Sequence, residues 1–504
     1  MDHETLADAA AVVGAFGAAG LLLARGRAEL LAAVVLLAAA ELGLAYALVP
    51  DAPGRLTDSA THAGALAVAG LAALVLAAVF VRLPAAAPVA LLVAAPFRVS
   101  VGLGSENAFL LVAFYAVLVS ATLAVVYQAV QRPDVQRIPT IIAAPAAALV
   151  ALAGLSLLWA HDPRAGTIEL LFFYFPFALL LAIVARTPIQ DWSWRALAAA
   201  LVSVTSIFAA IGVYQAWSHI EILAKQDVQL ANAYQPFFRV TSVFQDPSVY
   251  GRHLVLGIAV LLTLLWYARV RPTLGLLVLA LLAAGLYFSY SQTSFASLFV
   301  AVLLITLVAG GMLARKFVVG AAGAIIVAAA ALVMVFGDGD SAKRLTSDRI
   351  PLAQVTWPVY LDHPLVGVGV GSQPLVSHRQ EDAKNQKSKN VSHTTPLAMA
   401  AELGTVGLLV YLAFLAALAR AILSVWRRNR PLALSLAACL TALVVQSLFY
   451  GGFFEDPFVW GIAGVTAAAC SLLPQRVAGP LRHEPPVAAR AEPLPVPRRP
   501  DSAT

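Results

Sequence analysis

The sequence predicts an all-α polytopic membrane protein with a long extracytoplasmic loop. Hydrophobic residues make up 61% of its 504 residues and charged residues only 12%, whereas soluble domains carry about 25% charged residues. Apolar runs recur along the chain, and about 20 apolar residues are enough to cross about 30 Å of hydrocarbon. We therefore expect a membrane helix bundle of about 14 or 15 transmembrane helices.

The apolar runs, in order, define the expected helices, with boundaries good to a few residues. The segment 85–103 is interrupted by Pro96 and Arg98, which makes it a candidate for a re-entrant segment, and the last segment is weakly apolar. The segments lie near 8–24, 28–49, 61–82, 85–103, 106–130, 138–160, 167–185, 196–217, 249–268, 273–289, 292–311, 317–336, 396–419, 432–450 and 456–474.

Lysine and arginine fall in alternate connections, which the positive-inside rule assigns to the cytoplasm. The acidic N-terminus lacks the basic start of a cleaved signal peptide, so the first segment is expected to stay. This N-terminus and the polar stretch 337–395 then face outside. The cytoplasmic cations are Arg25, Arg27, Arg82, Arg132, Arg137, Arg186, Arg195, Arg269, Arg271, Arg315, Lys316, Arg420, Arg427, Arg428 and Arg430.

Three parts follow from this topology. Residues 1–137 form N-terminal transmembrane helices, and residues 138–478 form a core that includes the outer loops 218–248 and 337–395. Residues 479–504 are rich in Pro, Arg and Ala without apolar periodicity, so we expect a disordered cytoplasmic tail.

Composition narrows the partners and cofactors. The net charge of +6 does not indicate nucleic-acid binding, because no basic cluster is interleaved with aromatic residues on a soluble face. Cys439 and Cys470 both fall in apolar segments and predict neither a disulfide framework nor a metal site. We expect no cofactor, and we expect membrane lipids among the partners.

The first outer loop carries Arg239 and Arg252 on either side of a turn that leads into a span. The planar guanidinium fork matches phosphate oxygens bidentately. The alternative is structural, with both arginines reaching lipid headgroups or pairing with Asp246. Position alone favours the structural alternative.

The long outer loop combines an amphipathic stretch ending at Trp357 with the glycine series 367–371. That series lacks a βαβ context and is better explained as a tight backbone turn than as a dinucleotide site. The whole stretch 337–395 carries seven basic and six acidic residues, so the loop is mixed in charge. Lys384, Lys387 and Lys389 fit a solvated run better than a contact with lipid phosphates.

His393 closes this loop just before the next apolar helix, at the water boundary. Thr395 is a candidate cap and Pro396 suits the first helical position, so the positive helix end would face the outer surface. A histidine with an ordinary pKa near 6.5 can take a hydroxyl proton near neutral pH. An ordinary surface histidine, a polar partner for the helix end and a metal ligand are the alternatives.

Glu41 and Glu169 are ionisable residues inside predicted spans, and such residues are functional candidates by default. They keep a transporter or flippase as an alternative. The sequence shows neither repeated acids nor paired broken helices in matching halves, which are typical of transporters. A scaffolding role for the Pro-rich tail is a third hypothesis.

Four blocks resemble one family over residues 139–474. The sequence is similar to the O-antigen ligase and O-antigen polymerase superfamily of bacterial envelope glycosyltransferases. His393 is followed by Thr394, nine residues, Gly404, two residues and Gly407, which is similar to the ligase pattern. The matching blocks are 156–163, 239–250, 349–371 and 393–407.

The resemblance implies a metal-independent transferase of the GT-C type in the cytoplasmic (inner) membrane, with its active site on the extracytoplasmic face. It would pass a glycan from a polyprenyl (undecaprenyl) diphosphate to a lipid or saccharide acceptor. By motif, Arg239 and Arg349 would hold the diphosphate and His393 would assist the acceptor or leaving group. Further substrate-binding candidates are Arg252, Asp246, Tyr250, Trp357 and Gly369.

Three positions depart from the family's usual residues. Thr394 stands where ligases usually have Asn, Ser or Gln, Pro247-Ser248 replaces Pro-Asn, and Ser291-Gln292-Thr293 replaces a Ser-Arg element. These departures leave the acceptor open. The sequence therefore predicts a ligase, with a polysaccharide polymerase of the same superfamily as the alternative.

Overall fold

Helices form nearly all of the structure, a computed structural model that describes residues 3–50, 60–103, 106–132, 134–188, 191–235, 237–316, 319–323, 349–379 and 392–472. The all-α membrane fold is confirmed, with one two-stranded hairpin as the exception within these ranges. The expected tail 479–504 and most of the expected segment 317–336 lie outside the described residues.

The first half of the described chain forms long helices interrupted by two short irregular turns. Its helices are α1 (His3–Leu23), α2 (Arg27–Leu48), α4 (Ala60–Arg82), α5 (Ala86–Ala94), α6 (Val112–Gln131), α7 (Thr140–Leu155) with the 3-10 turn η1 (Ser156–Trp159), and α8 (Pro163–Glu169), which runs through the π-helical turn η2 (Leu170–Tyr174) into α9 (Phe175–Arg186).

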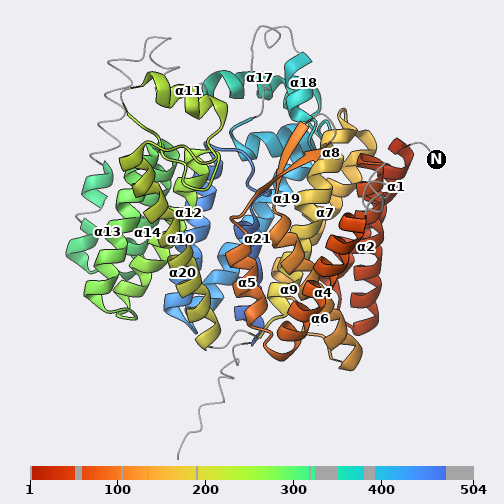
Figure 1. Cartoon of the computed structure of the whole chain (residues 1–504), viewed down its shortest axis with the longest axis horizontal. Coiled ribbons are helices and arrows are strands. Elements are labelled where there is room, and N and C mark those ends of the chain that lie inside the picture. Colours follow the sequence, from red (N-terminus) through yellow and green to blue (C-terminus); the bar gives the residue numbers. More distant parts are fainter. Residues whose placement is uncertain are drawn as a thin grey trace, which may run out of the picture. The chain divides into compact units, whose positions relative to one another are not determined.

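The second half adds long helices and three shorter ones. Its helices are α10 (Asp191–Ser218), α11 (Gln226–Tyr234), α12 (Pro247–Trp266), α13 (Pro272–Ser289), α14 (Gln292–Ala309), α17 (Arg349–Asp362), α18 (Gln373–Arg379), α19 (Thr395–Trp426), α20 (Arg430–Ser447) and α21 (Pro457–Leu472). In Figure 1, α11, α17 and α18 lie across one end of the bundle, which we call the loop end.

Eleven helices among the described residues are long and apolar enough to cross a membrane, judged by length and composition. Two further apolar helices, Ala67–Arg82 and Pro457–Ser471, are shorter. The second of these corresponds to the weakly apolar last segment of the sequence. Among the described residues, the predicted segments and the observed helices agree closely in position, apart from the segment 85–103 and the start of the segment 106–130.

The expected segment 85–103 is not one helix. Helix α5 has nine residues, so it rises about 14 Å and cannot cross the membrane. It ends just before Pro96, whose ring is incompatible with a continuing helix. The chain then forms an antiparallel hairpin of β1 (Val99–Leu103) and β2 (Glu106–Leu110), with Val99 opposite Leu110.

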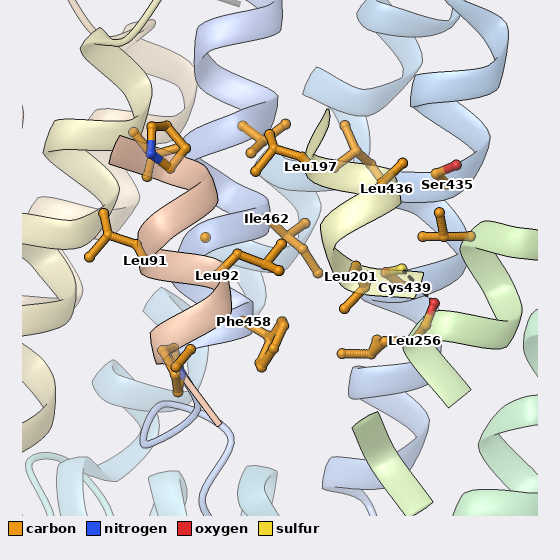
Figure 2. Close-up of a pocket in the computed structure, with 18 of the residues that line it drawn as sticks. Leu91, Leu92, Leu197, Leu201, Leu256, Ser435, Leu436, Cys439, Phe458 and Ile462 are labelled. Atoms are coloured by element: carbon orange, nitrogen blue, oxygen red, sulfur yellow. Dashed lines mark hydrogen bonds between the residues drawn. The ribbon is translucent and has the colours of Figure 1, made fainter. Parts of the chain in front are cut away.

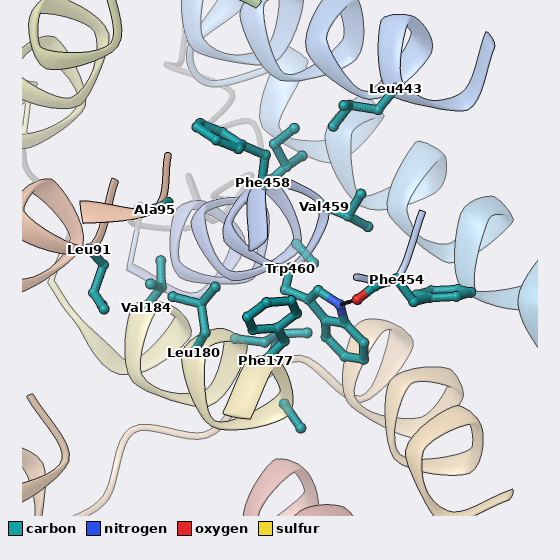
Figure 3. Close-up of a cluster of buried hydrophobic side chains, with 14 of the residues drawn as sticks. Leu91, Ala95, Phe177, Leu180, Val184, Leu443, Phe454, Phe458, Val459 and Trp460 are labelled. Carbon is teal, nitrogen blue, oxygen red and sulfur yellow. Dashed lines mark hydrogen bonds between the residues drawn. The ribbon is translucent and has the colours of Figure 1, made fainter. Parts of the chain in front are cut away.

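The centre of the bundle is built around α9 and α21, which pack closely together. Trp460 of α21 is completely buried, and its indole N–H donates to the Phe454 carbonyl at 3.0 Å. Figure 3 shows this ring among Phe177 and Leu180 of α9. The N-terminal helices join this core directly, because α1 contacts α7 and α9.

Helix α19 contains a break at Gly404, whose φ of 66° and ψ of −166° are open almost only to glycine. The break frees backbone groups in a helix of apolar sequence, and the segment 364–369 satisfies them. The Val368 N–H donates to the Ala401 carbonyl at 3.0 Å, and the Thr405 N–H donates back to Pro364 at 2.8 Å. The long loop is thereby locked to α19.

The glycine series forms the tight turns that the sequence predicts, because Gly367, Gly369 and Gly371 all have positive φ. The block 156–163 forms hydrogen bonds with the other side of the glycine series. The His161 N–H donates to the Val368 carbonyl at 3.1 Å, and the Ser156 hydroxyl accepts from the Val370 N–H at 3.0 Å. Three of the four motif blocks therefore meet in one place.

Replacing Gly404 with alanine should destabilise this junction. The backbone there is glycine-specific, with a cost of about 1–3 kcal/mol for another residue, and the new Cβ would collide with the Leu365 carbonyl. We expect a lower midpoint of thermal unfolding in detergent. Gly70→Ala in α4 is the control, since its Cβ meets nothing within 4 Å; equal midpoints for the two variants would contradict the assignment.

Candidate functional site

A buried ion pair lies near the loop end, between α12 and the start of α21. Arg252 Nη1 donates to Asp456 Oδ2 at 2.5 Å, and the two side chains are only 10% and 7% exposed. The other Asp456 oxygen accepts from the Phe458 N–H at 2.9 Å. The Nε of Arg252 is buried without a hydrogen-bond partner among the described residues, which leaves a donor for a ligand.

The ring of Tyr450 links this ion pair to His393. The guanidinium carbon of Arg252 lies 5.3 Å from the ring centroid of Tyr450. The imidazole of His393 stacks on the same ring, with centroids 6.2 Å apart and planes within 8°. Burial raises the pKa of Tyr450, so its hydroxyl stays protonated at neutral pH. Two candidates from separate loops thus share one aromatic neighbour.

Arg98 is a further cation at this site, and sequence reasoning did not assign it a role. It follows α5 and lines a small cavity of about 20 Å³ together with Arg252, His253 and Asp456. Its side chain is exposed. Burial raises the pKa of Glu455, while Arg98 and Arg252 act in the opposite direction. The Pro96–Arg98 interruption of an apolar segment was the signal in the sequence.

A glutamine side chain fixes the backbone next to His393. The Ser392 N–H donates to Gln373 Oε1 at 2.9 Å. The Gln373 amide nitrogen in turn donates to Ser377 Oγ at 2.7 Å and to Thr356 Oγ1 at 3.2 Å. His393 is therefore positioned by α17 and α18, which the glycine series holds against α19.

The helix start after His393 differs in detail from the expectation. Pro396 lies in the first turn of α19, as predicted, but Thr395 is already helical and Thr394 occupies the cap position. No side chain caps this end. The Thr394 hydroxyl instead donates to the Leu448 carbonyl at 3.3 Å, which ties the helix start to the end of α20.

Asp246 organises the first outer loop. Its Oδ1 accepts from the Ser248 N–H at 2.7 Å and caps α12, and its Oδ2 lies 3.9 Å from Lys225 Nζ. Arg239 is half-buried, and Asn232 holds its backbone through hydrogen bonds at 2.8 and 3.2 Å. Burial lowers the pKa of Arg239 and Asp246 opposes this, so the two groups interact.

The Asp246 carboxylate also affects the pKa of Tyr450, the residue on which His393 stacks. Asp246 is among the groups that raise the pKa of Tyr450. Asp246 therefore interacts electrostatically with Arg239 of the first outer loop and with the tyrosine on which His393 stacks.

Two candidates of the long loop lie on α17. Arg349 is its first residue, but its side chain lies outside the described part of the chain. Trp357 is 51% exposed, and its ring centroid lies 5.5 Å from that of Tyr360. Trp357 therefore offers an accessible aromatic face at the loop end.

Tyr250 and Gly369 lie in closely packed surroundings, and their assignment as substrate contacts stays a prediction. Tyr250 is completely buried, with its hydroxyl against Gly212 of α10 and Gly285 of α13. A Cβ at Gly369 would collide with the backbone of Ala160, and its N–H donates to the Glu402 carbonyl at 2.9 Å. Residue type and motif position do not distinguish packing from substrate binding at these positions.

The intramembrane acids occupy different surroundings. Glu169 interacts electrostatically with Glu402 and Glu455, which brings three carboxyl groups together near the site. The Glu402 side chain accepts the backbone N–H groups of Gly371 and Gln373. Glu41 in α2 lies elsewhere, with a buried oxygen that has no hydrogen-bond partner among the described residues.

An apolar pocket with a volume of about 120 Å³ adjoins the polar cavity. Figure 2 shows its walls, including Leu91 of α5, Leu201 of α10 and Cys439 of α20. Ala95, Pro457 and Phe458 line both this pocket and the cavity of Arg98 and Arg252. A ligand with an anionic head and an apolar chain would find both surfaces side by side.

No group of three or more His, Cys, Asp or Glu side chains in the described ranges is arranged to hold a metal ion. The charged groups at the site are instead arginines and carboxylates. Its chemistry is suited to binding an anion beside a histidine that can exchange a proton.

Comparison with protein-family models matches part of the chain. Residues 276–412, from α13 into α19, match the family model described as O-antigen ligase. This range contains His393 and the break at Gly404, but not Arg98, Arg252 or Asp456. No curated protein matches the chain. This segment is therefore similar to the O-antigen ligase family, which supports the resemblance to the O-antigen ligase superfamily.

Proposed function

We propose that this protein transfers a glycan from polyprenyl (undecaprenyl) diphosphate to an acceptor hydroxyl at the outer face of the cytoplasmic membrane. The match to the O-antigen ligase family model indicates an envelope glycan transferase of the ligase or polymerase type. The observation that carries the finer proposal is the approach of His393 and Arg252 to the same Tyr450 ring, beside an apolar pocket.

The leaving group explains the cations. When the bond between the glycan C1 and the diphosphate oxygen breaks, negative charge develops on the diphosphate, and preorganised donors stabilise it. Arg98 and Arg252 line one cavity for this purpose, with Arg239 and Arg349 contributed by the outer loops. Because guanidinium groups supply the positive charge, the proposed reaction needs no metal ion.

The acceptor reacts on the histidine side. As the acceptor oxygen bonds to C1, its proton passes to His393, whose imidazole is held by stacking on Tyr450. The diphosphate leaves with the electron pair of the broken bond. Tyr450 remains a neutral hydrogen-bond donor, since burial raises its pKa.

The apolar pocket supplies a place for the first part of the polyprenyl chain. Its walls are almost entirely aliphatic and aromatic side chains from α5, α6, α9, α10, α12, α20 and α21. Each buried CH₂ group stabilises binding by about 0.8 kcal/mol. Its junction with the cavity of Arg98 and Arg252 fits a lipid with the diphosphate at one end.

The outer-face assignment rests on charge distribution. Among the short connections, those on the side opposite the loop end carry most of the Lys and Arg residues, which favours the cytoplasm for that side. The loop end, with Arg239, Trp357 and His393, then faces outward. There it would meet the lipid-linked glycan and its acceptor.

Loss of a site cation or of the histidine should stop transfer without unfolding the protein. For Arg98→Ala, Arg239→Ala and His393→Ala we expect rates about 100-fold or more below wild type, the typical effect of removing one preorganised donor. Glycan transfer would be measured with a defined polyprenyl-diphosphate donor. Arg82→Ala, which removes an exposed arginine at the opposite end of the bundle, should retain activity.

Arg252 needs a milder change because its loss would leave Asp456 buried without a partner. Arg252→Lys keeps a cation but loses the planar fork that binds two phosphate oxygens. We expect a folded protein with strongly reduced transfer. Near-normal transfer in all four site variants would refute the proposed site.

Gln373 tests how His393 is positioned. Gln373→Ala should lower kcat while leaving the KM for the donor nearly unchanged, because the diphosphate cations stay in place. Gln373→Glu retains the oxygen that accepts the Ser392 N–H and should recover part of the lost activity. Equal losses in the two variants, or a change confined to KM, would rule out this positioning role.

Deleting the protein from its host would distinguish a ligase from a polymerase. Because both use the same donor and differ in acceptor, accumulation of complete but unattached chains indicates a ligase. Loss of long chains indicates a polymerase. The ligase-like spacing after His393 leads us to expect unattached chains; a normal glycan profile would contradict both.

A further inference from the structure

Five arginines gather around one hollow at the end of the bundle opposite the loop end. The hollow has a volume of about 460 Å³, and its arginines are exposed. They come from the start of α10, from the connection after α12 and from the α19–α20 connection, so distant parts of the sequence meet here. The arginines are Arg195, Arg269, Arg427, Arg428 and Arg430.

The positive-inside rule alone does not explain this convergence. That rule acts on the charge of each connection and does not require three connections to surround one concavity. Other cations of the same face, such as Arg82, Arg315 and Lys316, do not line the hollow. Among its described lining residues there is no carboxylate that could neutralise the arginines.

Two tryptophans orient part of the arginine set. The Arg195 guanidinium lies 6.0 Å from the ring centroid of Trp194, and that of Arg430 lies 5.9 Å from Trp426. Stacking uses the face of a guanidinium and leaves its N–H edge available for an anion. Tryptophan also belongs at the level of lipid headgroups.

The hollow borders the apolar pocket from the other side. Trp194 lines both, and Pro431 of the hollow is followed directly by Leu432 of the apolar pocket. A ligand here therefore meets a cluster of guanidinium groups and, next to it, an aliphatic wall. Basic pockets between transmembrane helices on the cytoplasmic side have the chemistry to hold anionic lipid headgroups.

We propose that this hollow binds the phosphate headgroup of an anionic phospholipid of the inner leaflet, with its chains lying on the wall that begins at Trp194 and Leu432. The hollow is separate from the cavity of Arg98 and Arg252, because the two share no lining residue, although both border the apolar pocket. It does not depend on the proposed function.

Purified full-length protein in detergent provides the test. Binding of phosphatidylglycerol would be titrated by native mass spectrometry for wild type and for the triple variant Arg269→Gln, Arg427→Gln, Arg430→Gln. Since each cation near an anionic lipid contributes about 1 kcal/mol, we expect at least about tenfold weaker binding in the triple variant. If that variant does not fold, Arg269→Gln alone should weaken binding about fivefold.

The matched control is Arg82→Gln, Arg315→Gln, Lys316→Gln, which removes the same charge from the same face outside the hollow. It should bind phosphatidylglycerol like wild type, and phosphatidylcholine should bind weakly to all three proteins. Equal binding by the hollow variant, an equal loss in the control, or tight phosphatidylcholine binding would overturn the proposal. If inorganic diphosphate displaced phosphatidylglycerol completely, the proposal would be wrong about the lipid, and the ligand of the hollow would be a soluble phosphate compound.

Discussion

The break in α19 at Gly404 is the constraint on which the site depends. Backbone groups released inside an apolar helix must find partners, because the membrane offers no water to replace them. The segment 364–369 supplies those partners and is thereby fixed against α19. The next residues carry Gln373, which holds the backbone beside His393. A glycine in α19 thus helps to fix the backbone beside His393.

The ion pair of Arg252 and Asp456 has a different purpose. The free energy needed to remove two charges from water is often larger than their mutual attraction provides, so a buried ion pair is weak evidence for stability. Here the pair orients a guanidinium beside Tyr450 and Arg98. We interpret it as preorganisation for an anionic ligand, because Arg252 retains a buried Nε without a hydrogen-bond partner in the described structure.

Most of the fold could be predicted from apolar periodicity, because membrane helices must satisfy their own backbone groups and are long. The exception, 85–103, shows the limit: composition is apolar throughout, but Pro96 ends the helix and a hairpin follows. For the candidate site, motif position predicted His393, and the place of Arg252 beside the turn before a span made it a candidate. Motif position could not show that Tyr250 faces inward, or that Asp456 and Tyr450 complete the group, because side-chain direction and contacts between distant segments are set by packing.

Arginines at the two ends of the bundle differ in burial, and burial decides how each of them can bind an anion. Near the loop end, Arg252 is buried and paired, so its position is fixed and its charge is strong in a medium of low dielectric constant. At the opposite end, the arginines of the hollow are exposed, and water and salt screen each of them. Only a cluster can then attract an anion. A single oriented guanidinium suits a developing charge in a reaction, whereas a screened cluster suits a headgroup that stays bound.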